Sequence, residues 1–230
     1  HTTKYMHQIL DLSLDAYDEI LSEIDTTNLV ERKGIIYIWT NKNIRSRKME
    51  IKIRNDLGIK QRLLNREQVL ELEPNLSPIF DAGVIYDYAY HARDPKEITK
   101  KLFELFLKSG GKFKKEEVIN VEQTRYNQTQ VKTNTEKFKF EKIVLACGAF
   151  SKKLTDQLGE KIPLDTERGY HVHYKKMDHL LKRPVIFLDR GFGMTPMNQG
   201  LRAVGTVELG GFDNPISKKR IDYIDKCAKE

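Results

Sequence analysis

The stretch Lys142-Ile-Val-Leu-Ala-Cys-Gly-Ala-Phe-Ser151 determines how the rest of the chain is interpreted. A short apolar run with two β-branched residues ends at Gly148, which predicts a strand covered on both faces. Ser151 is placed to cap a following helix. Ligands of open α/β sheets bind beyond the carboxyl ends of such strands, where small residues let a nucleotide approach the backbone. The sequence therefore predicts a nucleotide cradle at Gly148. The alternative is a buried strand that runs into a glycine turn without a ligand.

Composition indicates a soluble globular protein. The 230 residues, of which 39% are hydrophobic, can form the core of one large domain or two small ones. No run approaches the roughly 18 to 20 apolar residues that cross a bilayer, and residues 1–4 lack the apolar core of a signal peptide. Cys147 and Cys227 lie far apart without metal-ligand spacing, which favours free thiols in a reducing compartment. Cys147 is expected to be buried.

The charge balance is basic, with 40 Lys and Arg against 33 Asp and Glu and a net charge of +7. Such an excess is typical of proteins that bind nucleic acid, phosphate or a membrane surface. Here the basic residues are scattered among acidic ones, and no zinc-finger, RNP-type or basic-zipper pattern accompanies them. The sequence therefore predicts a solvated lysine-rich surface, with no nucleic-acid partner and no metal site.

The periodicity of hydrophobic residues and the positions of capping and turn residues predict alternating helices and strands. The clearest local signal is Asp94-Pro95-Lys96-Glu97, with Asp at the cap, Pro at the first helical position and Glu at the third. The expected helices cover residues 4–25, 43–57, 69–73, 95–108 and 151–158, with a last one from about 217. The expected strands cover residues 34–39, 61–64, 83–90, 117–126, 128–133, 138–146, 170–174, 185–188, 193–197 and 201–207, and an Asn127-Gln128 turn joins two of them.

No glycine-rich dinucleotide turn accompanies the predicted cradle. Nothing matches Gly-x-Gly-x-x-Gly, and Gly191-Phe192-Gly193 is neither followed by a third glycine at the right spacing nor placed before a helix. Either the cradle at Gly148 is not a dinucleotide site, or the chain is part of a longer protein.

Two long segments carry a family resemblance. The first is Val144–Ser151, continued by Leu158-Gly159 and by residues 162–171, and the second is Gly200-Leu-Arg-Ala-Val-Gly-Thr-Val-Glu208. With the Asp94-Pro95 helix start, they resemble the D-amino-acid oxidase superfamily of FAD-dependent oxidoreductases. The similarity is greatest to its bacterial D-amino acid dehydrogenase branch.

The resemblance implies an α/β (α+β) fold, which combines part of a doubly wound FAD-binding domain with a mixed-sheet substrate domain and flanking helices. Residues 1–93 would form the first part of the substrate domain, 94–160 the central part of the FAD-binding domain, and 161–230 the second part of the substrate domain. In this family a glycine turn lies at the N-terminus and a late Gly-x-Arg-Pro segment binds the substrate carboxylate. Neither occurs here, so the chain resembles an interior fragment, expected to hold no FAD and to be inactive alone.

The resemblance also implies cofactor contacts. Val118 falls where the family offers backbone groups to adenine, and Ala146, Gly148 and Ala149 fall where a small-residue segment passes the pyrophosphate and ribose of FAD. Phe150 stands where many members carry Trp. An aromatic wall is therefore kept, while one N–H donor is lost.

The expected substrate-binding residues are Tyr170, Arg168, Met194 and His91, and no catalytic residue is assigned. Alternation along a strand puts Tyr170 on the substrate side and His171 on the other face. Met194 shares a face with Phe192 on a strand that runs near the flavin in this family. Glycine oxidases of the family tend to carry polar aromatic residues in this region, which is flanked here by Gly191 and Gly193, so the resemblance disfavours a very small amino acid as substrate.

Two of these assignments leave structural alternatives open. His91 could be an exposed or capping histidine. Arg168 could form a structural ion pair with Asp165 or Glu167, two carboxylates that otherwise resemble part of a solvated loop.

The function implied by the resemblance is FAD-dependent oxidation of the C–N bond of a D-amino acid. Hydride transfer to the flavin gives an imino acid, which water hydrolyses to a 2-oxo acid and ammonia. Reoxidation by a quinone or an electron-transfer partner fits the dehydrogenase branch, with oxygen as the other acceptor, and implies a cytoplasmic protein that is peripheral to the inner membrane. The alternatives are an FAD-dependent 2-hydroxy-acid or glycerol-phosphate dehydrogenase of the same superfamily and a non-enzymatic anion-binding module.

Overall fold

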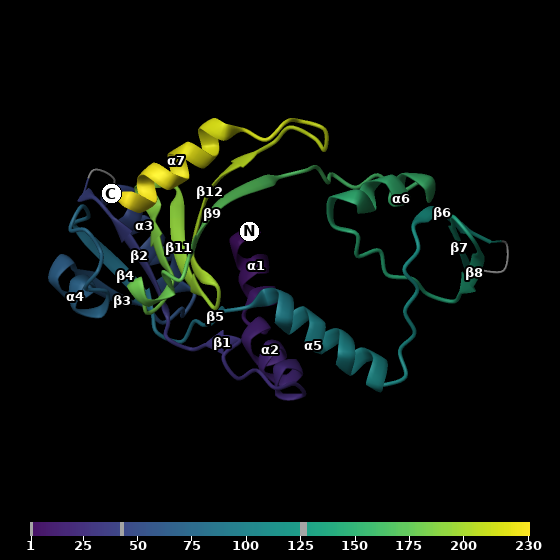
Figure 1. Ribbon diagram of the computed structural model, residues 1–230, viewed down its shortest axis with the longest axis horizontal. Helices are drawn as coiled ribbons and strands as arrows, with labels where there is room; N and C mark the ends of the chain where they lie inside the picture. Colours follow the sequence, from purple (N-terminus) through teal and green to yellow (C-terminus); the bar gives the residue numbers. More distant parts are fainter. Residues whose placement is uncertain (1, 42–43, 125–127) are drawn as a thin grey trace. The chain divides into compact units, whose positions relative to one another are not determined.

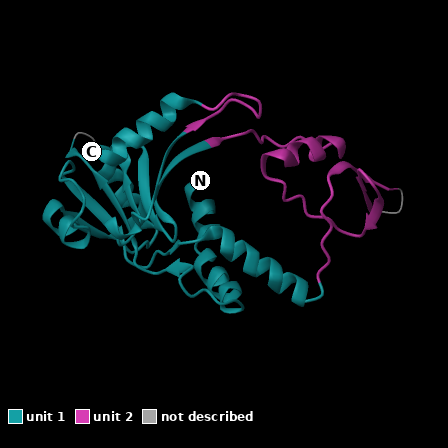
Figure 2. Cartoon of the chain, in the orientation of Figure 1, with its two compact units in different colours: residues 1–110, 169–206, 217–230 teal, residues 111–168, 207–216 magenta. Residues whose placement is uncertain are grey.

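The computed structural model describes residues 2–41, 44–124 and 128–230. These residues form two compact units, shown in different colours in Figure 2. The first contains residues 1–110, 169–206 and 217–230, and the second contains residues 111–168 and 207–216. These boundaries differ from the expected 1–93, 94–160 and 161–230, because helix α5 (Pro95–Lys108) groups with the first unit and residues 207–216 group with the second.

A seven-stranded mixed sheet forms the centre of the first unit (Figure 1). Strands β2 and β10 run parallel, whereas the pairs β3–β4, β4–β2, β10–β11 and β11–β12 are antiparallel. In spatial order the strands are β3 (Arg62–Asn65), β4 (Ala82–Tyr86), β2 (Ile35–Trp39), β10 (Val185–Phe187), β11 (Phe192–Met197), β12 (Gly200–Glu208) and β9 (Arg168–Lys175). A separate pair joins β1 (Val30–Glu31) to β5 (His91–Ala92).

Helices cover both faces of this sheet. Ile36 and Ile38 of β2 belong to a core cluster that includes Val69 of α4 (Arg66–Leu72) and Cys227 of α7 (Lys218–Lys229). Trp39 belongs to another cluster, against which Ile51 of α3 (Ile44–Asp56) packs. This two-sided cover follows from the alternation of side chains along a strand. It confirms the predicted mixed sheet with flanking helices.

Local signals placed most elements of the first unit correctly. The side chain of Asp94 accepts a hydrogen bond from the N–H of Glu97 at 3.0 Å, as the cap before α5 predicts. Asn65 and Gln68 form a capping box, so α4 begins at Arg66, three residues earlier than expected.

The single helix expected over residues 4–25 is wrong. The chain forms α1 (Thr2–Leu10) and α2 (Ser13–Ser22), because the Ser13 hydroxyl donates to the carbonyl of Leu10 at 2.5 Å and competes with the helical pattern there. The apolar side chains of α1 are not buried in the described structure, so packing does not enforce one straight helix.

The second unit contains a three-stranded antiparallel meander and a short helix. The strands are β6 (Val118–Gln123), β7 (Thr129–Thr133) and β8 (Lys137–Phe140), and the helix is α6 (Ser151–Gln157). The Gln157 amide fastens α6 to β6, since its oxygen accepts from the N–H of Val121 at 2.9 Å and its nitrogen donates to the carbonyl of Ile119 at 3.2 Å. The predicted turn at Asn127 lies outside the described residues.

Only the first part of the strand expected over residues 138–146 forms, and its buried apolar run at residues 143–146 does not. Strand β8 ends at Phe140, and the irregular segment that follows leaves Val144 89% exposed and Cys147 exposed rather than buried. The physical reason is that no strand among the described residues pairs with this segment, so it has neither ladder hydrogen bonds nor cover. Ser151 also does not cap α6. Its hydroxyl accepts from the N–H of Cys147 at 3.1 Å.

Candidate functional site

The predicted cofactor segment is an exposed turn in the second unit. Gly148 begins a short 3-10 helix (η2, Gly148–Phe150) with φ of 56°, a left-handed conformation that a side chain would strain. A Cβ placed on Gly148 would meet no atom within 4 Å. Ala146 and Gly148 are exposed and Ala149 is half-buried. The backbone here is therefore open to an approaching ligand, and the residues present fit a backbone contact with an extended group such as FAD.

An aromatic pair adjoins this turn. The rings of Phe150 and Phe212 stack with centroids 4.3 Å apart and planes 25° apart. The Lys153 ammonium lies 5.9 Å from the Phe150 centroid and 5.7 Å from the Phe212 centroid, over both rings. The aromatic wall expected at Phe150 is thus supported by a second ring from residues 207–216.

Arg168, an expected substrate contact, is bonded to this same segment of the second unit. One terminal nitrogen of its guanidinium donates to the carbonyl of Asn214 at 2.6 Å, and the other donates to the carbonyl of Phe212 at 3.1 Å. A weaker contact of 3.4 Å reaches the carbonyl of Pro215. The main donors of Arg168 therefore bind backbone carbonyls of this chain.

The acidic partner of Arg168 was not foreseen. An ion pair with Asp165 or Glu167 was the structural alternative, but the carboxylate within reach belongs to Glu208, 3.5 Å from the guanidinium. The structure therefore favours that alternative with a different partner, because Glu208 ends the neighbouring strand β12 whereas Asp165 and Glu167 precede β9.

Val118, the expected adenine contact, begins strand β6 in the second unit. It pairs with Thr133 of β7, and its side chain is half-buried. The structure thus keeps Val118 and the Gly148 turn in one compact unit.

Tyr170 and His171 point to opposite faces of β9. Tyr170 is buried and His171 is exposed, as the alternation predicts. The Tyr170 hydroxyl accepts a hydrogen bond from the N–H of Ser217 at 3.1 Å, and its ring packs with Ile224 of α7. The face that Tyr170 occupies is therefore covered by α7, and its contact with substrate stays a prediction.

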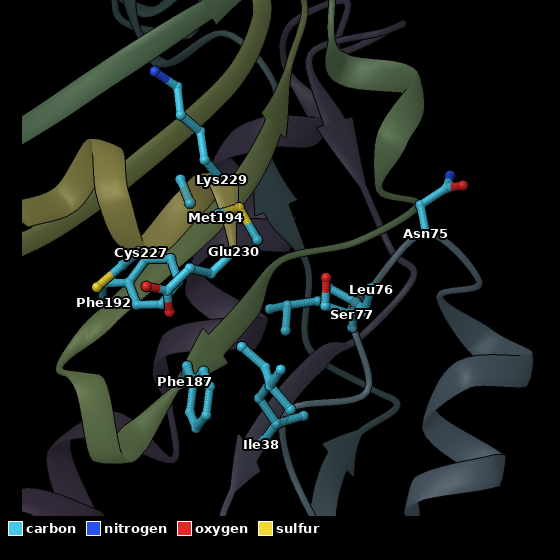
Figure 3. Close-up of a pocket in the computed structure, with 13 residues that line it drawn as sticks. Ile38, Asn75, Leu76, Ser77, Phe187, Phe192, Met194, Cys227, Lys229 and Glu230 are labelled. Carbon is cyan, nitrogen blue, oxygen red and sulfur yellow. The ribbon is translucent and has the colours of Figure 1, made fainter.

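Met194 lines a cavity of about 170 Å³ in the first unit, whose walls are partly apolar and partly polar (Figure 3). Phe187, Phe192 and Cys227 of α7 also line this cavity, as do the polar side chains of Asn75, Ser77, Lys229 and Glu230. The expectation that Phe192 and Met194 share a face is confirmed. Met194 also packs against the cluster that contains Tyr170, so the structure brings these two substrate candidates together.

His91 neither lines the cavity beside Met194 nor belongs to the second unit that contains the Gly148 turn. It is buried in β5, opposite Glu31 of β1, and its Nε2 is 3.9 Å from the carboxylate of Glu31. Burial lowers the pKa of His91, although the charge of Glu31 opposes this effect. The alternative of an exposed or capping histidine is wrong, because His91 is buried and lies in strand β5.

Phe212 and Glu208 are the residues of this region that the sequence reasoning missed. The available signal was Gly210-Gly211 directly before an aromatic residue, in the connection between a strand and a helix. Over residues 2–41, 44–124 and 128–230 the structure shows no cluster of three or more metal-ligating side chains. In the same ranges no helix is both long and apolar enough to cross a membrane.

Known proteins resemble the chain over most of its length. A family model described as FAD dependent oxidoreductase matches residues 1–230. A D-amino-acid oxidase from Bradyrhizobium diazoefficiens is 29% identical over 217 residues, 93% of this chain and 52% of that protein. A D-amino acid dehydrogenase from Vibrio atlanticus is 23% identical over 240 residues, 98% of this chain and 55% of that protein. The chain spans about half the length of these curated relatives.

Solved structures show the same fold. Glycine oxidase from Geobacillus kaustophilus matches 95% of this chain and 59% of its own, with a TM-score of 0.80 and 19% identity. L-Proline dehydrogenase from P. horikoshii matches 95% and 60%, with a TM-score of 0.80 and 18% identity. With the family model matching every residue from 1 to 230, the chain belongs to the FAD dependent oxidoreductase family.

Proposed function

We propose that the whole protein oxidises the C–N bond of a D-amino acid to a 2-oxo acid and ammonia with FAD as cofactor. The main support for this proposal is the similarity to a relative named D-amino-acid oxidase, which extends over 93% of this chain. Relatives named D-amino acid dehydrogenase support the same substrate class. FAD, when bound, supplies the acceptor for the hydride that leaves the substrate Cα. Because the chain belongs to a family of oxidoreductases, we favour an enzyme over a non-enzymatic anion-binding module.

The contribution of this chain to FAD binding is a backbone surface. The Gly148 turn offers open space beside a left-handed residue, and Ala146 and Ala149 add no bulk. Val118 would offer backbone groups from the start of β6 to the adenine. Phe150, supported by Phe212, would form an aromatic wall beside the cofactor.

On the substrate side, Tyr170, Met194 and His91 remain proposed contacts. The chemistry requires that the carboxylate be held, that the Cα–H bond be aligned with the flavin and that the amine stay deprotonated. The contact of Tyr170 and Met194 with one cluster supports a shared role for this pair. For Arg168 we propose a structural role instead of a substrate contact, because its donors bind backbone carbonyls.

The electron acceptor separates two versions of this function. Relatives named oxidase and relatives named dehydrogenase both match the chain. A quinone or an electron-transfer partner would suit a cytoplasmic protein peripheral to the inner membrane, and oxygen would suit an oxidase. Both acceptors, and this location, are part of the proposal.

The test uses the purified whole protein with its visible flavin absorbance as readout. Anaerobic addition of D-amino acids should bleach the flavin, whereas the L-enantiomers should not. 2-Hydroxy acids and glycerol phosphate are assayed in parallel, since dehydrogenases of those substrates are the alternative. Bleaching by one of those substrates alone, or a preparation without flavin, would overturn the proposal. Reoxidation by oxygen or by a soluble quinone then identifies the acceptor.

A further inference from the structure

The connection between β12 and α7 is anchored by contacts with Arg168 despite its glycine-rich composition. Residues 209–217 contain two adjacent glycines, Gly210 and Gly211, and expose the apolar side chains of Leu209 and Ile216. Glycines and a lack of buried apolar contacts ordinarily leave such a connection mobile. An anchor outside the connection is therefore needed to hold it in one conformation.

Arg168 supplies that anchor. Its guanidinium is a planar fork of donors, which suits several acceptors in fixed directions. It binds the carbonyls of Phe212 and Asn214 at 3.1 and 2.6 Å, and it lies 3.5 Å from the carboxylate of Glu208. The side chains of Arg168 and Glu208 are only 27% and 19% exposed, so solvent screens their interaction less than at an open surface. One side chain thus fixes the start and the middle of the connection.

The anchored connection in turn supports the cofactor turn. Phe212 stacks on Phe150, the residue that ends the 3-10 helix begun by Gly148. Within the turn, the N–H of Phe150 donates to the carbonyl of Cys147 at 3.1 Å. The Phe212 ring supports Phe150 from outside the turn, and the Lys153 ammonium lies over both rings. Arg168, Phe212, Phe150 and Gly148 all belong to the second unit.

We propose that Arg168 is a positioning residue of the FAD site. By holding the connection of residues 209–217 it keeps Phe212 against Phe150, and this contact fixes the Gly148 turn in the shape that receives the cofactor. The inference rests on the proposed role of the Gly148 turn in FAD binding. It assigns Arg168 no contact with substrate or flavin.

The first experiment measures amide hydrogen exchange in the whole protein after removal of the flavin. Arg168→Lys keeps the charge but replaces the planar fork, whose two terminal nitrogens bind different carbonyls, by donors on a single nitrogen, which do not reproduce that geometry. Exchange in the connection of residues 209–217 and in residues 148–150 should rise at least about tenfold, as expected for loss of interactions worth about 1.4 kcal/mol. Arg62→Lys is the matched control, because Arg62 makes a comparable bidentate contact with Asp87 in the first unit. The control should leave both segments unchanged.

The second experiment measures FAD affinity of the same proteins by flavin fluorescence. Arg168→Lys and Phe212→Leu should raise the Kd for FAD by about 10- to 100-fold, and Phe212→Tyr, which keeps the stacked ring, should restore it. Saturating FAD should recover kcat in Arg168→Lys, which a globally unfolded variant would not do. Phe106→Leu, in the stacked Phe103–Phe106 pair of α5, is the control for loss of an exposed ring.

The outcomes separate the two proposals. If the wild-type protein binds FAD and Arg168→Lys leaves both exchange and affinity unchanged, the positioning role is overturned while the proposed function stands. If exchange rises but FAD affinity does not change, the connection is anchored for another reason and the inference also fails. A wild-type protein that binds no FAD overturns the proposed function first, and the cofactor role of Arg168 with it.

Discussion

The completely buried carboxylate of Glu73 accepts a hydrogen bond from Nε of Arg183 at 3.0 Å. Its other oxygen accepts from the N–H of Lys182 at 2.9 Å. Burial raises the pKa of Glu73, although these two hydrogen bonds and the charge of Arg183 act in the opposite direction. The pair joins the end of α4 to the segment that leads into β10. Because both side chains are largely shielded from water, each charge of this ion pair is stabilised by the other.

Glu73→Ala should lower the free energy of unfolding by about 3 to 5 kcal/mol, because it leaves the mostly buried guanidinium of Arg183 without its partner. Urea denaturation of the whole protein measures this loss. The control is Asp56→Ala, which breaks an exposed pair with Lys52 on α3 and should cost within about 0.5 kcal/mol. A loss at Glu73 no larger than that of the control would show that the buried pair is dispensable.

His91 should make stability depend on pH. Burial lowers its pKa in the folded state below the ordinary value of about 6.5, so the unfolded chain binds the proton more readily. The contribution of neutral His91 is therefore complete above the unfolded-state pKa of about 6.5 and is lost as the pH falls from there to the lower folded-state pKa, with a slope of up to about 1.4 kcal/mol per pH unit. Urea denaturation at pH 7.5 and 5.5 should show a smaller difference in His91→Gln than in wild type. His171→Gln, at an exposed histidine, should leave the difference unchanged. Equal slopes in wild type and His91→Gln contradict the prediction.

Gly148→Val should weaken FAD binding by more than it weakens the fold. The left-handed backbone makes a branched side chain costly by roughly 1 to 3 kcal/mol, and that side chain would fill the open space beside the turn. Gly159→Val is the matched control, since Gly159 has φ of 81° and equally open surroundings at the end of α6 in the same unit. Flavin titration and thermal unfolding of both variants of the whole protein separate the two effects. If both variants retain FAD equally well, the Gly148 turn has no specific role in FAD binding.

Tyr170→Phe removes the acceptor for the N–H of Ser217 at the start of α7 and should cost about 1 kcal/mol of stability. The proposed substrate contact adds a second expectation, a fall in kcat/KM of roughly 2- to 150-fold for a D-amino acid. His171→Ala, on the exposed face of the same strand, should change either quantity much less. Steady-state kinetics on folded Tyr170→Phe decide between the roles. An unchanged kcat/KM would leave the hydrogen bond to Ser217 as the function of the phenol.

Local chemistry in the sequence was sufficient for many of the elements. The caps at Asn65 and Asp94 and the strand that begins at Ile35 were predicted because their signals lie within a few residues of each other. The resemblance drawn from residues 144–171 and 200–208 was confirmed by the family model. The same local reasoning failed at Val144, whose apolar neighbours favour a buried strand but find no strand to pair with among the described residues.

The sequence by itself thus determined the family, the FAD cofactor that the family uses and the order of the principal helices and strands. Only the tertiary structure decided the partners of single side chains: Glu208 and the carbonyl of Phe212 for Arg168, Ser217 for Tyr170, and Arg183 for Glu73. The reason is that caps and periodicity act between residues close in the chain, whereas these contacts join residues that are from 40 to 110 positions apart. Which donor meets which acceptor across such separations depends on how the strands and helices pack.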